Sequence, residues 1–190
     1  MEGFAPRDGG YASSMSSGEA LLLRQLASEV LVVLDDPGEC AVTPSVLSAL
    51  TETELRREAP RERSLGMLLP PMSVDREDAA RMRALTEDLL RAEKSARLRS
   101  IIADLDSIVH GGADTLIVRP EAVWSWLGAL NDIRLGLAGE LALADQSDAR
   151  RVERLAASEP TGEHAQVVAA IYMLVTWWQD SLLEAVNNPR

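Results

Sequence analysis

The sequence contains very little cysteine or histidine. Of its 190 residues, one is a cysteine, Cys40, and two are histidines, His110 and His164. A single cysteine cannot form an intrachain disulfide, nor can it supply the several thiolates of a zinc site. Neither histidine has a metal-ligand spacing to a second histidine, a cysteine or a carboxylate. We therefore expect no metal and no other cofactor.

Short catalytic motifs are also missing. No G-x-S-x-G, H-E-x-x-H, P-loop or dinucleotide-binding glycine pattern occurs. Because no residue pattern supports catalysis, the sequence predicts a protein that is not an enzyme.

The chain lacks the features that would direct it to a membrane. Its first ten residues have neither the basic start nor the apolar core of a signal peptide. The longest apolar run, Val167 to Trp178, is far shorter than a membrane span. We expect a cytoplasmic protein that does not contact membranes.

Positive charge is scarce. The formal net charge is −11, and Lys94 is the only lysine. This balance disfavours nucleic acid as a partner unless basic residues gather on one face. The two basic clusters, around Arg56–Arg63 and Arg91–Arg99, are interleaved with carboxylates, which is typical of a solvated mixed-charge surface. Direct DNA contact stays an open alternative.

Apolar residues recur every three or four positions, which predicts helices. The expected fold is all-α: a single-domain bundle of five or six helices over residues 18–188, after a disordered Gly- and Ser-rich tail over residues 1–17. The predicted helices cover residues 18–34, the segment from Thr43-Pro44 to before Pro60, residues 75–110 with a bend or break near 94–97, residues 120–143, and residues 163–187.

The segment 120–143 has the strongest helical pattern and is predicted to lie buried at the centre of the bundle. Its large apolar residues form one stripe: Val123, Trp126, Leu127, Leu130, Ile133, Leu137 and Leu141. Gly128, Gly136 and Gly139 each cost about 1 kcal/mol of helix propensity relative to alanine. Such glycines permit the close approach of a neighbouring helix.

A polar island interrupts this apolar helix at Asn131, Asp132 and Arg134. Asp132 and Arg134 are two residues apart and do not face each other on a helix. Since buried polar groups need partners, the favoured interpretation is a structural network across helices, and the alternative is a partner-binding hot spot.

The last predicted helix contains Trp177, Trp178 and Gln179. The same two interpretations apply to them: a structural role within the bundle, or a surface that binds a partner. Adjacent residues on a helix point in directions about 100° apart. Both tryptophans can be buried only if this helix is covered on two sides, which self-association of the chain would achieve.

Cys40 lies between two predicted helices, beside Asp35, Asp36 and Glu39. Acidic neighbours disfavour a reactive thiolate, so an inert thiol is the favoured interpretation and a redox thiol the alternative.

The central block of the segment 120–143 reads Trp126-Leu-Gly-Ala-Leu-Asn-Asp-Ile-Arg-Leu-Gly-Leu. It resembles the pattern W-L-x-x-L-N-D-L-R-L-x-L of an actinobacterial family of domains of unknown function, which includes an oxidation-sensing transcriptional regulator. The stretches that begin at Glu19, Leu69, Arg83 and Tyr172 are similar to other family segments. The resemblance covers about residues 18 to 187.

The resemblance implies a mostly helical cytoplasmic regulator of transcription in the oxidative-stress response, acting through protein contacts with a sigma factor or RNA polymerase. The redox switch of the family's oxidation sensor is a C-x5-C pair, and this chain, with Cys40 alone, lacks it. An alternative function is a structural or adaptor protein that oligomerises through its last helix, without redox sensing.

Overall fold

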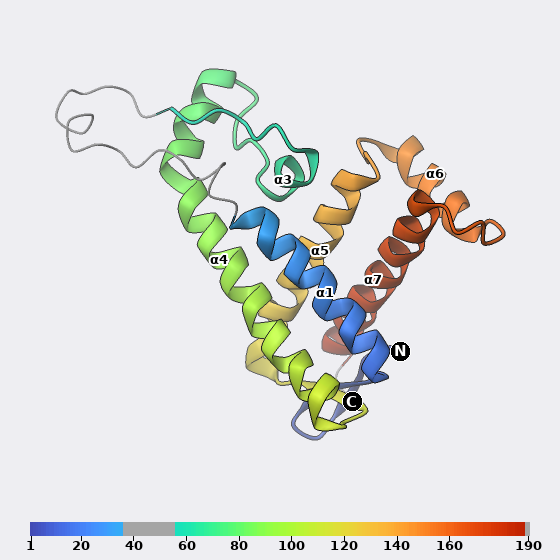
Figure 1. The fold of residues 1–190 in the computed structure, drawn as a ribbon. Coiled ribbons are helices and arrows are strands. Elements are labelled where there is room, and N and C mark those ends of the chain that lie inside the picture. Colours follow the sequence, from blue (N-terminus) through green and yellow to red (C-terminus); the bar gives the residue numbers. More distant parts are fainter. Residues whose placement is uncertain (36–55, 189–190) are drawn as a thin grey trace.

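Six helices and a small sheet make up the part of the chain that the structure, a computed structural model, describes, namely residues 1–35 and 56–188 (Figure 1). The α-helices are α1 (Ser17–Leu34), α3 (Arg63–Leu68), α4 (Arg76–Gly111), α5 (Val123–Glu140), α6 (Gln146–Ala157) and α7 (His164–Asn187). The strands are β1 (Ala5–Arg7), β2 (Gly10–Ser14) and β3 (Thr115–Val118), and a short 3-10 turn, Pro120–Ala122, precedes α5. The predicted helical architecture is confirmed, but a strictly all-α fold is wrong because of the sheet.

The sheet lies at one end of the helices and is antiparallel, in the order β1-β2-β3 (Figure 1). Residues 1–17, predicted to be a disordered tail, contain its first two strands. Arg7 pairs with Gly10, so Asp8 and Gly9 form a two-residue hairpin turn, and Gly9 has a positive φ of 90°. The partner of β2 is β3, about a hundred residues further along the chain.

Helix α1 begins at a capping box. Ser16 accepts a hydrogen bond from the Glu19 backbone amide, and the Glu19 side chain accepts one from the Ser16 amide. The predicted helix over 18–34 is confirmed, with its N-cap at Ser16.

Helix α4 is one uninterrupted helix from Arg76 to Gly111, so the predicted break near residues 94–97 is wrong (Figure 1). Its start at the Asp75 cap is confirmed, and it ends at Gly112, whose φ of 70° is left-handed. The buried face runs along the whole helix at helical spacing: Arg83, Glu87, Arg91, Lys94, Leu98, Ile101, Leu105 and Ile108. The buried face is charged in the first half of the helix and apolar in the second half. Hydrophobic residues therefore do not follow one continuous stripe along the sequence, although the helix itself is continuous.

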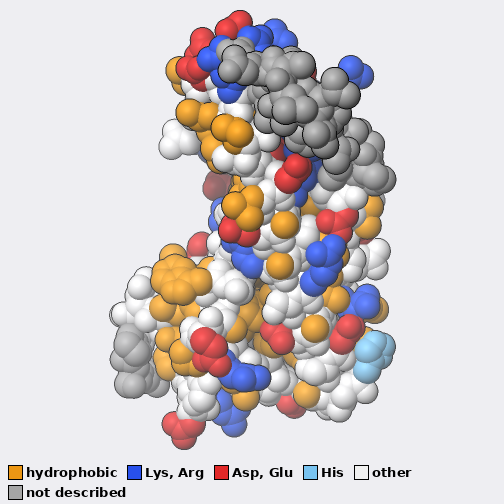
Figure 2. All heavy atoms as spheres, turned by 90° about the vertical axis from the view of Figure 1, so that its left-hand side faces the viewer, with side chains coloured by type: hydrophobic (Ala, Val, Ile, Leu, Met, Phe, Trp, Pro, Cys, Tyr) orange, Lys and Arg blue, Asp and Glu red, His pale blue; other side chains and the backbone are white. Residues whose placement is uncertain are grey.

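The apolar residues of the first half of α4 consequently face outward. Met82, Leu85 and Leu89 follow helical spacing, for which hydrophobic periodicity predicts burial, but they are 44%, 73% and 66% exposed. Figure 2 looks onto the side of the molecule that carries α4 and shows hydrophobic side chains lying among charged ones there.

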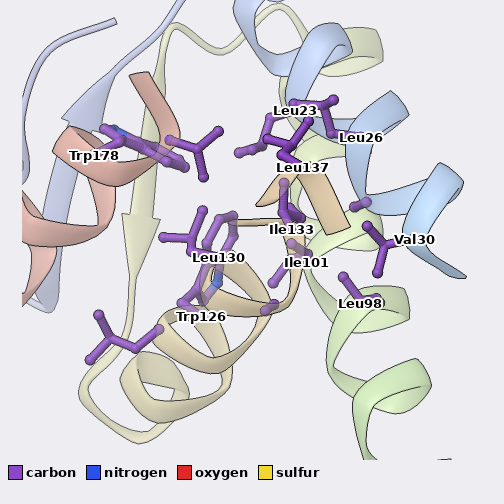
Figure 3. Packing of buried hydrophobic residues seen from close by; sticks show 14 of the residues in the cluster. Leu23, Leu26, Val30, Leu98, Ile101, Trp126, Leu130, Ile133, Leu137 and Trp178 are labelled. Atoms are coloured by element: carbon purple, nitrogen blue, oxygen red, sulfur yellow. The ribbon is translucent and has the colours of Figure 1, made fainter. Parts of the chain in front are cut away.

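Helix α5 lies at the centre of the core, in contact with α1, α3, α4 and α7. All seven residues of its predicted apolar stripe are buried. Figure 3 shows Trp126, Leu130 and Ile133 of α5 packed among residues of α1, α4 and α7. Burial of each large apolar side chain stabilises the fold by about 1.5–3 kcal/mol.

Two helices are present that the predicted set does not include. Residues 63–68 form α3, and residues 146–157 form α6, which begins at the Asp145 cap. Most of the predicted helix after Thr43-Pro44 lies outside the described residues.

Candidate partner-binding site

The polar island of α5 connects the central helix to two of its neighbours. Asp132 is 1% exposed, and its Oδ1 accepts a hydrogen bond from Nζ of Lys94 on α4. Arg134 donates from Nη1 to Oε1 of Gln179 on α7 (2.7 Å), and its guanidinium lies 5.7 Å from the centre of the Tyr172 ring. Asn131 is half-buried on the same helix. Asp132 and Arg134 therefore take part in contacts between helices.

The pair formed by Lys94 and Asp132 is a buried salt bridge. The second carboxylate oxygen of Asp132, Oδ2, is buried without a hydrogen-bond partner. A buried ion pair gives little net stability, but the loss of one partner leaves an uncompensated charge. The only lysine of the chain is therefore tied to the central helix.

A second buried charge cluster lies on α4 around Glu87, and the sequence patterns did not predict it. Arg83 and Arg91 donate to the Glu87 carboxylate at 3.0 and 2.9 Å, and Arg57 lies 3.3 Å from it. Arg83 also donates to the Leu69 carbonyl, and Arg91 to the carbonyl of Leu34 at the end of α1. The i, i+4 spacing of Arg83, Glu87 and Arg91 was the available signal.

The two neighbouring tryptophans of α7 have different environments. Trp178 is buried: its indole Nε1 donates to the Ser13 hydroxyl (3.0 Å), and its ring packs against Phe4 and edge-on against Trp126. Trp177 is 47% exposed. The single chain thus buries one of the two rings, and the other remains accessible.

Gln179 lies between α7 and α5. Its side-chain amide donates to the Leu127 carbonyl (3.2 Å), while its oxygen accepts from Arg134. This residue therefore bridges the two helices.

A cavity of about 490 Å³ opens between α1, α3 and α5. Its apolar lining includes Ile133 and Leu137 of α5, Leu26 and Val30 of α1 and Leu68 of α3, all of which are mostly buried. This volume is within the range of ligand pockets, about 300–1,000 Å³. We call this cavity the α1–α5 groove.

Glycines of α5 determine how closely the neighbouring helices approach at this groove. A Cβ atom at Gly139 would lie 2.4 Å from the Cα of Ser64, and one at Gly136 would lie 3.0 Å from Val30. The Ser64 hydroxyl donates to the Gly136 carbonyl (3.1 Å). The close approach predicted from these glycines is present, and it brings α3 onto the backbone of α5.

The rim of the groove is acidic. Glu29, Glu62 and Glu140 line it, and among the described residues of the lining Arg63 is the only basic one. Oε1 of Glu140 lies 2.6 Å from Nε2 of His164. Carboxylates outnumber cationic side chains in the lining, so the groove favours a positively charged ligand.

Residues 1–186 match the family described as Domain of unknown function (DUF2017). The chain belongs to this family. Among curated proteins, this DUF2017 chain is similar to the Oxidative stress regulator AosR of Mycobacterium bovis and of two strains of Mycobacterium tuberculosis. The identity is 26% over 199 aligned positions, which cover 97% of this chain and 86% of each relative. No solved structure matches the chain.

Cys40, the predicted redox candidate of this DUF2017 chain, lies outside the described residues. Within residues 1–35 and 56–188, no cluster of three or more His, Cys, Asp or Glu side chains is arranged to hold a metal ion. Over the same ranges, no helix combines the length and apolarity needed to cross a membrane.

The basic clusters of this DUF2017 chain are largely paired with its own carboxylates. Arg57 contacts Glu87 and Asp88, and Arg99 contacts Asp35. These pairs neutralise part of the charge that contact with DNA phosphates would require.

Proposed function

We propose that this DUF2017 protein is a non-enzymatic regulator of the oxidative-stress response that acts by binding another protein. The observation that carries the proposal is the similarity to regulators named for oxidative stress over 97% of the chain. The partner we propose is a component of the transcription machinery, either a sigma factor or RNA polymerase.

Two features of the chain support a protein partner over DNA. The net charge is −11, and several arginines of the two basic clusters are paired within the chain. The α1–α5 groove instead offers an apolar surface with an acidic rim. Protein recognition commonly combines an apolar centre with a charged rim.

An intrachain disulfide switch is not part of this proposal, because Cys40 is the only cysteine. The proposed regulation therefore depends on the partner, or on another signal, and not on a disulfide within the chain.

Affinity capture of the tagged protein from its own host cells, with and without peroxide, tests the proposal. Recovery of a sigma factor or RNA polymerase is the expected result. If peroxide changes the recovery, the same experiment with Cys40→Ser measures any contribution of the thiol. Recovery of the chain alone in both conditions would contradict the proposal.

A second candidate function is an adaptor that assembles through α7. Trp177 and Leu183 are 47% and 42% exposed on this helix. Exposed aromatic residues are frequent anchors of protein interfaces. Here Trp177→Ala should lower the mass measured by light scattering, and an unchanged mass would count against assembly through this helix.

A further inference from the structure

The α1–α5 groove continues beyond the cavity. Leu26 lines both this cavity and a narrow apolar seam between α1 and α7, where Leu22, Ile171 and Leu174 meet it. The face of α1 from Leu22 to Val33 thus borders an extended apolar surface. These twelve residues are separated by eleven helical steps and so span about 17 Å, which is the length of roughly three helical turns.

Apolar side chains along this surface remain accessible although they follow helical spacing. Leu22 is 37% exposed, and Val33, Ile171 and Leu174 are only partly buried. Other residues of α7, such as Val168 and Val175, are buried. The surface between α1 and α7 is therefore an incompletely covered part of the helical core.

The charge of the rim indicates the character of the ligand. Glu29 on α1, Glu62 before α3 and Glu140 at the end of α5 approach the groove from three elements. All three are exposed, although Oε1 of Glu140 already contacts Nε2 of His164 at 2.6 Å. A ligand that covers the apolar lining and meets these carboxylates has an apolar stripe flanked by basic residues.

We propose that the α1–α5 groove binds an amphipathic helix of the protein partner, with its apolar face toward Val33 and Leu137 and its basic residues toward Glu29, Glu62 and Glu140. A helix about three turns long matches the length of the surface along α1, and docking of an amphipathic helix into an apolar groove is a common mode of recognition. This inference deepens the proposed function and rests on it for the identity of the partner.

The test uses the full chain and a synthetic probe. The probe is a helical peptide of about 14 residues, with leucines at i, i+3, i+4 and i+7 and lysines on both flanks, and its twin carries glutamate in place of every lysine. The lysine peptide should shift the NMR signals of the Gly136 and Gly139 amides and the Leu26 methyl groups. Equal binding of the glutamate twin, or shifts confined to other parts of the protein, would overturn the proposal.

Charge reversal then distinguishes the effect of the rim carboxylates on binding from the effect of the net charge of the protein. The triple variant Glu29→Lys, Glu62→Lys, Glu140→Lys should weaken binding of the lysine peptide about tenfold or more, which corresponds to at least about 1.4 kcal/mol. A matched control changes the net charge equally at exposed glutamates that do not line the groove: Glu121→Lys, Glu153→Lys, Glu184→Lys. If the control weakens binding as much as the rim variant, the rim does not select the ligand and the proposal fails.

The groove and the proposed function can fail separately. If the wild-type chain and the rim variant capture the same sigma factor or polymerase equally well, the groove proposal is wrong and the regulatory function stands. If the lysine peptide binds in the groove but the wild-type chain captures no transcription protein, the groove stands and the regulatory function is contradicted.

Discussion

The contact between α3 and α5 makes a quantitative prediction for Gly139→Ala. The new methyl carbon would lie 2.4 Å from the Cα and 2.6 Å from the backbone nitrogen of Ser64. A backbone segment cannot rotate away as a side chain can, so α3 must shift. Overpacking of this kind costs about 1–3 kcal/mol, which exceeds the gain of about 0.5–1 kcal/mol expected when alanine replaces a helical glycine.

Gly128→Ala is the matched control on the same helix. Its methyl carbon would lie 2.3 Å from Nη1 of Arg97, the far end of a flexible side chain that can move. The control should therefore be neutral, or more stable by up to about 1 kcal/mol.

Urea unfolding followed by far-ultraviolet circular dichroism measures both free energies. Of the wild type and the two variants, Gly139→Ala should have the lowest urea midpoint of unfolding. If Gly139→Ala is as stable as Gly128→Ala, α3 does not rest on the backbone of α5, and the described wall of the groove is wrong.

Three further predictions concern the contacts between helices and the sheet. Lys94→Met should cost about 3–5 kcal/mol because it leaves the buried Asp132 carboxylate uncompensated. The double variant with Asp132→Leu should recover much of that loss in urea unfolding, and a double variant less stable than the single one would contradict the reasoning. Trp178→Phe replaces the indole with a smaller aromatic ring and removes the donor to Ser13, so it should cost about 1–3 kcal/mol and speed amide hydrogen exchange in β2 more than in α4. Hydrogen bonds from the N-terminal amine and from Ser16 lower the pKa of Glu19 from 4.5 to about 2, so its stabilisation is complete above pH 4.5 and is lost as the pH falls toward 2. Glu19→Gln should therefore be less stable than the wild type at pH 6, by about 1 kcal/mol for this partly exposed pair, and the difference should vanish near pH 2.

The helices that bury apolar stripes could be predicted from the sequence. The stripe of α5 is periodic over its full length, and every residue assigned to its core is buried. The sheet could not be predicted by periodicity, because its strands have three to five residues and β2 pairs with a strand that lies far away in the sequence. The Asp8-Gly9 pair between short segments was the local signal for the hairpin.

Helix α4 shows a second limit of sequence patterns. Hydrophobic periodicity assumes that the buried face is apolar, whereas α4 buries Arg83, Glu87 and Arg91, which neutralise one another. The pattern therefore assigned Leu85 and Leu89 to the core, although both are mostly exposed.

The candidate site was only partly accessible from the sequence. The polar island and Gln179 could be singled out from the sequence, and in the structure Asp132 and Arg134 contact neighbouring helices. The groove could not be recognised, since its lining comes from α1, α3 and α5 and depends on how these helices approach one another.

Transcript levels after a brief peroxide challenge test the central claim most directly, namely that the chain regulates the oxidative-stress response through a protein contact at the groove. Four strains of the host are compared: wild type, a deletion of the gene, the rim variant with lysine at positions 29, 62 and 140, and the matched charge control. The account predicts that the deletion and rim-variant strains share one altered set of transcripts, while the control strain responds as the wild type does. A deletion strain whose response equals that of the wild type would contradict the account.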